Sequence, residues 1–148
     1  MPRYSYSELL ECGTNVLQAA GSSRAEAAVV AEGLLIADAR GVSSHGYTRL
    51  RAFAERVRRG IVRPDVAITL IRDTPAFLHV DGGNGMGIAS ARQTMALCIE
   101  RARTNGCCFA AIANANHFGI AAHYTLQAVE AGMIGIAMSN APASTVPI

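Results

Sequence analysis

The hydrophobic periodicity of the sequence changes at Pro64, and this change constrains the fold more than any other feature. Residues 1–64 place apolar side chains at helical spacing in three stretches. Residues 65–148 alternate short apolar runs, typical of buried strands, with longer stretches of helical character. We therefore predict an α/β fold in which a helical N-terminal segment, residues 1–64, precedes a mixed α/β sheet segment, residues 65–148.

Three helices are predicted in the N-terminal segment. The first begins with the capping-box pair Ser5 and Glu8, and the second begins with the same pattern and ends near Asp38. The third is expected to begin at residues 43–44 and to end at Gly60. Together these helices form the head of the predicted fold.

The second segment is expected to contain four strands and two helices. The strands are predicted at residues 66–71, 76–80, 107–113 and 133–139, and the helices at residues 88–104 and 119–131. The last strand is apolar throughout and is expected to be buried on both faces. Because the sequence ends shortly after it, we expect the 148 residues to be the truncated N-terminal part of a longer fold.

The composition is that of a folded globular domain, and it excludes several kinds of protein. Hydrophobic residues make up 51% of the chain and charged residues 16%, which excludes a disordered protein. All 13 basic residues are arginines, so neither a Schiff-base lysine nor a Walker phosphate loop is present. The four cysteines lack C-x-x-C spacing and are expected to be reduced, as in a cytoplasmic protein. With no signal peptide and no membrane-spanning apolar run, we expect a cytoplasmic protein without a membrane partner.

The densest basic stretch lies at residues 49–63, where arginines alternate with apolar residues at helical spacing. We interpret this stretch as a solvated helix face and expect no nucleic-acid partner. An anion- or nucleic-acid-binding patch is the alternative.

The stretch SSHGYTRL, residues 43–50, carries the densest set of reactive side chains. If Ser43 or Ser44 caps the third helix, His45 lies in its first turn and Arg49 lies four residues on, over the same face. A helix N-terminus disfavours an imidazolium, so His45 would stay neutral. A neutral imidazole beside a guanidinium suits a substrate whose carboxylate adjoins a carbonyl or hydroxyl. The alternative is a plain helix start with a solvated arginine.

The stretch NANHFG, residues 114–119, places His117 where a strand is expected to give way to a helix. In open α/β sheets, ligands bind beyond the carboxyl ends of the strands, and a following helix N-terminus attracts phosphates. Gly119 would let a ligand approach the backbone closely. The alternative is a structural histidine at the junction, which is the role that we expect for His79 and His123.

The glycine-rich stretch at residues 81–87 fails the G-x-G-x-x-G spacing in every register, so it is predicted to be a tight turn and not a Rossmann fingerprint. D-x-D, H-E-x-x-H and G-x-S-x-G motifs are also missing from the sequence. We therefore predict no metal site and no serine hydrolase.

Several ordered stretches resemble one family, the malate/L-lactate dehydrogenases that lack a Rossmann fold. The matching stretches are ADARGVSSHGYTRL from Ala37, VDGGNGMG from Val80, NANHFG from Asn114 and AGMIGIAMSNAP from Ala131. The family includes ureidoglycolate, sulfolactate and 2,3-diketogulonate reductases and the Δ1-piperideine-2-carboxylate reductases. The resemblance extends over nearly the whole chain.

The resemblance implies an oxidoreductase that transfers a hydride between NAD or NADP and a small 2-hydroxy, 2-oxo or cyclic imino carboxylic acid. In that family, Ser44 and His45 would form a proton donor/acceptor pair, and Arg49 would bind the substrate carboxylate. His117 is the other candidate for the catalytic proton, since members of the family differ in this respect. The residues expected to line the dinucleotide are His117, Phe118, Gly119, Ile120, Ala121 and Asn140.

The resemblance also implies a homodimer and a longer chain, in which the remaining part supplies most of the dinucleotide site. Two alternatives to the oxidoreductase stay open. One is a catalytically inactive fragment or interaction module that keeps only the N-terminal part of the fold. The other is a basic binding domain that uses residues 49–63.

Overall fold

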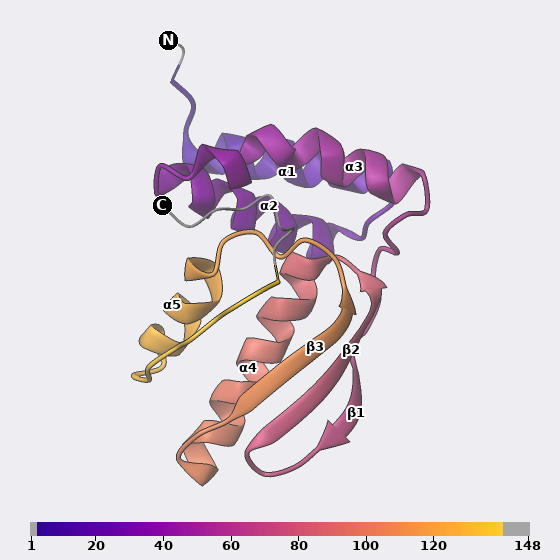
Figure 1. Ribbon diagram of the computed structural model, residues 1–148. Coiled ribbons are helices and arrows are strands. Elements are labelled where there is room, and N and C mark those ends of the chain that lie inside the picture. The colour runs from indigo at the N-terminus through magenta and orange to yellow at the C-terminus, as the bar shows by residue number, and fades with distance from the viewer. Residues whose placement is uncertain (1–2, 141–148) are drawn as a thin grey trace.

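The computed structural model of the chain describes residues 3–140, and three helices form a head at one end of it (Figure 1). A pair of short 3-10 turns connects the second helix to the third. The elements of the head are α1 (Tyr6–Ala20), α2 (Arg24–Ala39), η1 (Ser43–His45), η2 (Tyr47–Arg49) and α3 (Leu50–Arg58). The predicted helical N-terminal region is confirmed.

Side-chain caps fix where the first two helices begin. The Ser5 hydroxyl accepts the Glu8 N–H at 3.2 Å, and the Glu8 carboxylate accepts the Ser5 N–H at 2.8 Å, so the predicted capping box of α1 is formed. At α2, Ser23 accepts the Glu26 N–H in the same way. The Glu26 carboxylate, however, accepts the N–H of Asp65 at 3.0 Å and thereby ties α2 to the loop that leads to the sheet.

One apolar core joins the head to the first turn of the following helix, α4 (Gly87–Asn105). Leu17, Val30 and Leu34 are fully buried in it, and so is Ile88 of α4. Burying such a side chain contributes about 1.5–3 kcal/mol. The head is therefore packed firmly onto the α/β segment.

The sheet has three strands in the order β1-β2-β3, with α4 on one of its faces (Figure 1). Strand β2 pairs antiparallel with β1 and parallel with β3, and the crossover between the parallel strands is α4. The strands are β1 (Thr69–Asp73), β2 (Phe77–Gly85) and β3 (Phe109–Ala115), and the helix that follows β3 is α5 (Ala122–Glu130). The predicted mixed α/β layer is confirmed. Among residues 3–140, no helix combines the length and the apolar composition that crossing a bilayer requires.

Two predictions about the second segment differ from the structure in ways that matter for the site. The glycine-rich stretch is not a tight turn, because β2 continues to Gly85 through an irregular stretch in which Gly83 and Asn84 have φ values of 58° and 59°. The helix predicted at residues 119–131 begins only at Ala122. The reason is Gly119, whose φ of 75° lies in the left-handed region and breaks a right-handed helix.

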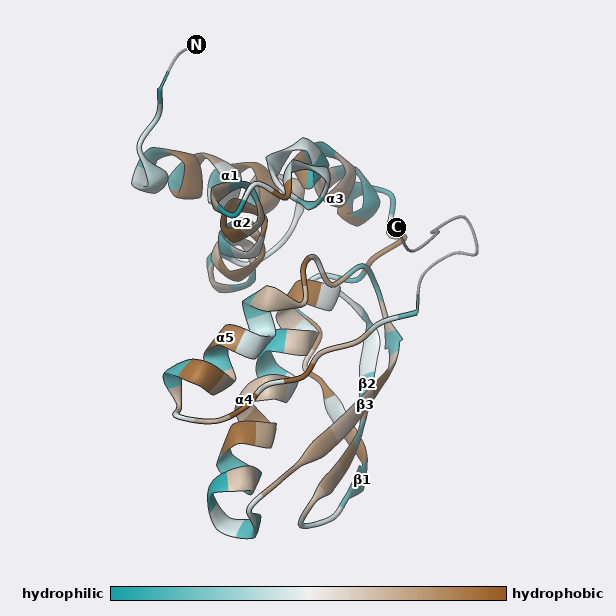
Figure 2. Cartoon of the chain, turned by 60° about the vertical axis from the view of Figure 1, so that its left-hand side comes forward, coloured by the Kyte–Doolittle hydropathy of each residue, from teal (hydrophilic) through white to brown (hydrophobic). Residues whose placement is uncertain are grey.

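The strand predicted at residues 133–139 is wrong for the described structure. These residues run back alongside α5 without pairing with any described strand (Figure 2). Gly135 packs so closely on Thr125 that an added Cβ would lie 2.8 Å from its Cα, whereas Ile134 and Met138 are 93% and 86% exposed. Apolar alternation can predict an extended backbone, but a strand also needs a neighbour to pair with.

Candidate functional site

The two histidines that the sequence singled out, His45 and His117, lie in contact between the head and the carboxyl end of β3. Their ring centroids are 5.3 Å apart, with the ring planes tilted by 33°. Phe53 of α3 meets His117 edge to face, with ring centroids 5.8 Å apart. The head and the sheet therefore each contribute one imidazole to the same small site.

The parallel pair β2 and β3 positions His117, because both strands end at the same edge of the sheet. Asn116 bridges the two ends: its side-chain amide donates to the carbonyl of Asn84 at 3.1 Å, to the Asn84 side chain at 2.9 Å and to the carbonyl of Gly85 at 3.0 Å. Asn114 and Asn84 both adopt left-handed backbone conformations. Residues in such strained conformations persist where the surrounding structure fixes them. The hydrogen bonds from Asn116 fix Asn84 in this way, next to His117.

The His117 loop also lies directly on the first turn of α4. A Cβ added to Gly87 would overlap the backbone oxygen of Asn116 and would lie 2.6 Å from that of His117. Glycine is therefore required at the start of α4. The sequence analysis gave this glycine no such role, because the contact joins positions far apart in the chain.

The environment of His117 selects one tautomer and disfavours the charged ring. Its Nδ1 accepts the N–H of Gly119 at 3.0 Å, so the proton of the neutral ring is on Nε2. Burial lowers the pKa of His117 below its usual value, and the charges of His45, Arg49 and Arg56 lower it further. At neutral pH, His117 is thus a neutral imidazole with an Nε2–H group to donate.

His45 does not lie in the first turn of a helix, contrary to prediction. It ends the 3-10 turn η1, and α3 begins only at Leu50. The interruption is at Gly46, which has an extended backbone and packs against the carboxylate of Asp38. A 3-10 turn of three residues is too short to have a helix macrodipole that could act on His45. The expected partner is present, since the Ser44 hydroxyl lies 2.9 Å from His45 Nδ1.

Arg49 ends the second 3-10 turn, four residues after His45, so the two do not share a helix face as predicted. One nitrogen of Arg49 is held. Its Nε donates to the carbonyl of Ser44 at 2.7 Å. Its two terminal nitrogens form no hydrogen bond or ion pair with residues 3–140. An anchored guanidinium with a free fork can bind a carboxylate bidentately.

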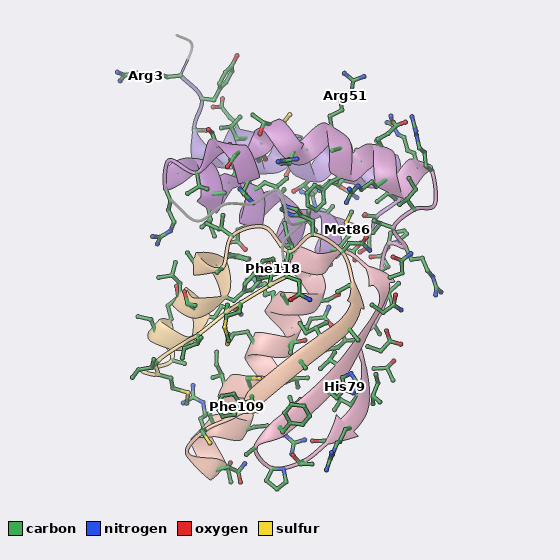
Figure 3. The ribbon with its side chains drawn as sticks, in the orientation of Figure 1. Arg3, Arg51, His79, Met86, Phe109 and Phe118 are labelled. Atoms are coloured by element: carbon green, nitrogen blue, oxygen red, sulfur yellow. The ribbon has the colours of Figure 1, made fainter. Side chains whose placement is uncertain are left out.

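The predicted cofactor residues divide into one loop and one isolated residue. The loop runs from His117 to Ala121, and Phe118 within it stacks on Tyr124 with ring centroids 5.3 Å apart. Figure 3 labels Phe118 and the buried Met86 near the junction of the head and the sheet. Asn140 lies exposed at the end of the described chain, and no described contact joins it to this loop.

The remaining loop residues form the entry to α5. Gly119 is buried, and the carbonyls of Ile120 and Ala121 accept the N–H groups of His123 and Tyr124. His123 is buried inside α5, where burial lowers its pKa. Figure 3 shows His79 on the sheet, well away from Phe118. Neither of these histidines belongs to the site.

Sequence reasoning missed two contributors to the site, Phe53 and Asp38. A helical wheel could have found Phe53, which follows Arg49 by four residues on the same face. Asp38 lies within the stretch from Ala37 that resembles the family, but the sequence assigns it no role, because its contact with Gly46 depends on how the chain folds back. Within residues 3–140, no group of three or more His, Cys, Asp and Glu side chains could hold a metal ion.

Comparison with known proteins gives one consistent result. Residues 4–148 match a family described as malate/L-lactate dehydrogenase. The chain is 38% identical over 138 residues to a malate dehydrogenase of Pyrococcus abyssi, covering 93% of this chain and 38% of that relative. It is 37% identical over 147 residues to ureidoglycolate dehydrogenase (NAD(+)) of Escherichia coli O157:H7, covering 98% of this chain and 41% of the relative.

The fold is similar to that of solved structures as well. The structure of malate dehydrogenase from Pyrococcus horikoshii OT3 superposes with a TM-score of 0.86 at 34% identity, covering 88% of this chain and 38% of that one. The chain therefore spans about two fifths of the length of these relatives, between 38% and 41%.

Proposed function

The chain belongs to the malate/L-lactate dehydrogenase family, and from this we propose that it is part of an NAD(P)-dependent oxidoreductase of small 2-hydroxy, 2-oxo or cyclic imino carboxylic acids. The observation that carries it is the ring contact of His45 and His117 beside the free fork of Arg49. A carboxylate held by that fork would place its neighbouring oxygen near both imidazoles.

The hydrogen bonds of the two histidines support different roles for them. His117 Nδ1 is occupied by the Gly119 N–H, so the ring has only its Nε2–H to offer and donates it to the substrate oxygen. His45, paired through Nδ1 with the Ser44 hydroxyl, is the ring that exchanges a proton with that oxygen. His117 thus polarises the carbonyl, and His45 with Ser44 handles the proton.

The loop of residues 117–121 is the part of the chain that we propose for the nicotinamide end of the cofactor. Apart from His117 its side chains are apolar, which suits a flat and weakly polar ring. The loop contains no arginine, so the phosphates of the dinucleotide need other groups. When bound, NAD(P)H supplies the hydride, while this loop orients the ring beside His117.

Turnover of NADH and NADPH with a panel of mono- and dicarboxylic 2-oxo acids tests the proposal. We expect His45→Ala to lower kcat by roughly 10²–10⁴-fold. His117→Ala should lower kcat as well, because the Nε2–H donor to the substrate oxygen is lost. His79→Ala is the matched control and should leave turnover unchanged. Wild-type kinetics in both site variants would refute the assignment.

A second candidate function, an interaction module, is favoured by one observation. Ile134, Ile136 and Met138 are 93%, 72% and 86% exposed in a segment that pairs with no described strand. Such a row of apolar side chains is typical of a surface that a partner covers, and the homodimer implied by the family would provide one. Light scattering distinguishes a second copy of the chain from another partner. If a second copy covers these apolar side chains, Ile136→Lys should reduce self-association. A monomeric wild type would refute the homodimer.

A further inference from the structure

Residues 43–49, which we call the site turn, are joined to one another by hydrogen bonds. The N–H of Gly46 donates to the carbonyl of Ser43 at 3.1 Å, and that of Arg49 donates to the carbonyl of Gly46 at 2.9 Å. The Thr48 hydroxyl and the Arg49 Nε then close the turn on the carbonyls of Ser43 and Ser44, each at 2.7 Å. His45 and Arg49 therefore keep their spacing as long as this turn is intact.

Two hydrogen bonds from Tyr47 fix where the site turn lies on the head. Its N–H donates to Asp38 Oδ2 at 2.8 Å, and its hydroxyl donates to the carbonyl of Leu9 in α1. Burial and nearby groups raise the pKa of Tyr47 to about 12, so the hydroxyl stays protonated and keeps donating. The first of these two anchors depends on a side chain, Asp38, that can be replaced.

Asp38 touches the site turn at its centre. Its carboxylate accepts the N–H of Tyr47, and it lies against Gly46 so closely that an added Cβ there would overlap it. Gly46 is buried, and it separates the turn that carries His45 from the turn that carries Arg49. One carboxylate in the last turn of α2 thus contacts Gly46, which joins the two turns, and Tyr47, where the second turn begins.

We propose that Asp38 is a positioning residue that places His45 and Arg49 for binding and proton exchange with the substrate acid. This inference rests on the proposed function, because it assigns Asp38 to the acid-binding side of that site. Asp38 acts through the backbone of Gly46 and Tyr47 and touches no reacting atom. Its loss should therefore weaken acid binding and turnover together, while cofactor affinity, which depends on the His117 loop, stays the same.

The carboxylate is needed for its position and its acceptor oxygen, not for its charge. Asp38→Asn keeps an oxygen that can accept the Tyr47 N–H, so it should retain wild-type behaviour to within about threefold. Asp38→Ala removes the acceptor and leaves the Tyr47 N–H without a partner. The equilibrium between the closed and the opened site turn should then shift roughly tenfold toward the opened form. Asp73→Ala is the matched control, because that carboxylate lies on β1, outside the site turn, and pairs with Arg101 of α4.

The first test needs no activity: hydrogen exchange of the Tyr47 amide and the ring resonances of His45, measured by NMR. In Asp38→Ala we expect this amide to exchange roughly tenfold faster and the His45 resonances to move, with no change in Asp38→Asn. Unchanged exchange and unchanged His45 resonances in a folded Asp38→Ala protein would overturn the proposal. Should Asp38→Ala not fold, Asp38→Glu carries the same test, because its extra methylene moves the carboxylate off the Tyr47 N–H.

The second test is calorimetric titration of the same variants with a 2-oxo acid and with NADH. We expect Asp38→Ala to bind the acid roughly tenfold or more weakly and NADH as the wild type does. A loss of NADH affinity alone would overturn the positioning role. If the wild type binds no 2-oxo acid, the proposed function fails, and the positioning of the site turn is then decided by the Tyr47 exchange.

Discussion

The two histidines of the site are held by opposite physical means. His45 lies on a short turn that hydrogen bonds fasten to α1 and α2. His117 lies on a half-buried loop that packs on α4, where Gly87 leaves it room and the Gly119 N–H fixes its tautomer. The first arrangement depends on a few polar contacts, and the second on close packing of backbone atoms.

This difference suggests how the site divides its work. A carboxylate needs an exposed fork with free donors, which Arg49 provides beside His45. A nicotinamide ring needs an apolar surface whose backbone does not shift, which the loop at His117 provides. A substitution near His45 and Arg49 should therefore change the affinity for the acid, and one near the His117 loop the affinity for the cofactor, each with little effect on the other ligand.

The largest expected effect comes from Gly87→Ala. The added Cβ would overlap backbone oxygens of Asn116 and His117, and backbone cannot move aside as a flexible side chain can. We expect a loss of about 3 kcal/mol in the free energy of unfolding and a loss of NADH binding. Urea denaturation and NADH fluorescence measure the two. Gly106→Ala is the control: its φ of 81° is strained but nothing lies within 4 Å, so about 1 kcal/mol is expected.

Gly46→Ala should disturb the site turn, on the His45 side of the site, with a smaller loss in the free energy of unfolding than Gly87→Ala. Its Cβ would overlap the carboxylate of Asp38, which is a side chain and can rotate away, so we expect a loss of about 1–2 kcal/mol. Acid binding should fall while NADH binding persists. Adding Asp38→Ala should recover part of the stability, because it removes the overlapping atoms. A double variant no more stable than Gly46→Ala would show that the overlap does not limit stability.

Arg49→Lys should sharpen the comparison with only a small loss of stability, because the single hydrogen bond from Nε to Ser44 is exposed. The Lys ammonium cannot reproduce the fork that binds a carboxylate, and Arg49 is exposed, so packing is not disturbed. We expect the KM for a 2-oxo acid to rise by roughly 10- to 100-fold, in line with the loss of charge-assisted hydrogen bonds. Arg51→Lys is the control, because Arg51 is an exposed arginine two residues further on, in the first turn of α3. Equal effects of the two substitutions would mean that Arg49 is only a surface residue.

The smallest expected effect is on the pH dependence of stability. Burial lowers the pKa of His117 and of His123, so between the lowered values and about 6.5 the unfolded chain binds more protons than the folded one. Stability should be full above that pH and should fall as the pH drops below it. Glu26, whose pKa burial raises, acts in the opposite direction. Urea midpoints at several pH values measure the slope, which should flatten in His123→Gln.

Local chemistry made the helices of the head predictable, and contacts distant in sequence made the site less so. The pair Ser5 and Glu8 contains all that is needed to start α1. The start of α3 was predicted too early because the chain is interrupted at Gly46, which packs against the carboxylate of Asp38. Local sequence patterns do not reveal that contact. Likewise, the apolar residues around Ile136 alternate like a strand, but a strand exists only where a neighbour pairs with it.

The site residues were predictable as separate candidates, not as an arrangement. Helical and strand patterns marked His45 and His117 as titratable rings at element boundaries, and the family resemblance joined them in one site. Their contact depends on the packing of Phe53 against the loop after β3, which no local motif encodes. The tautomer of His117 follows from the backbone of Gly119 and needed the structure.

Titration of histidine-labelled protein with a 2-oxo acid, followed by NMR, tests most directly whether the head and the sheet form a single site. We expect the ring resonances of His45 and His117 to shift together with one Kd, those of His79 to stay in place, and Arg49→Ala to abolish both shifts. Shifts with two different Kd values, or a shift of only one of the two rings, would contradict the account.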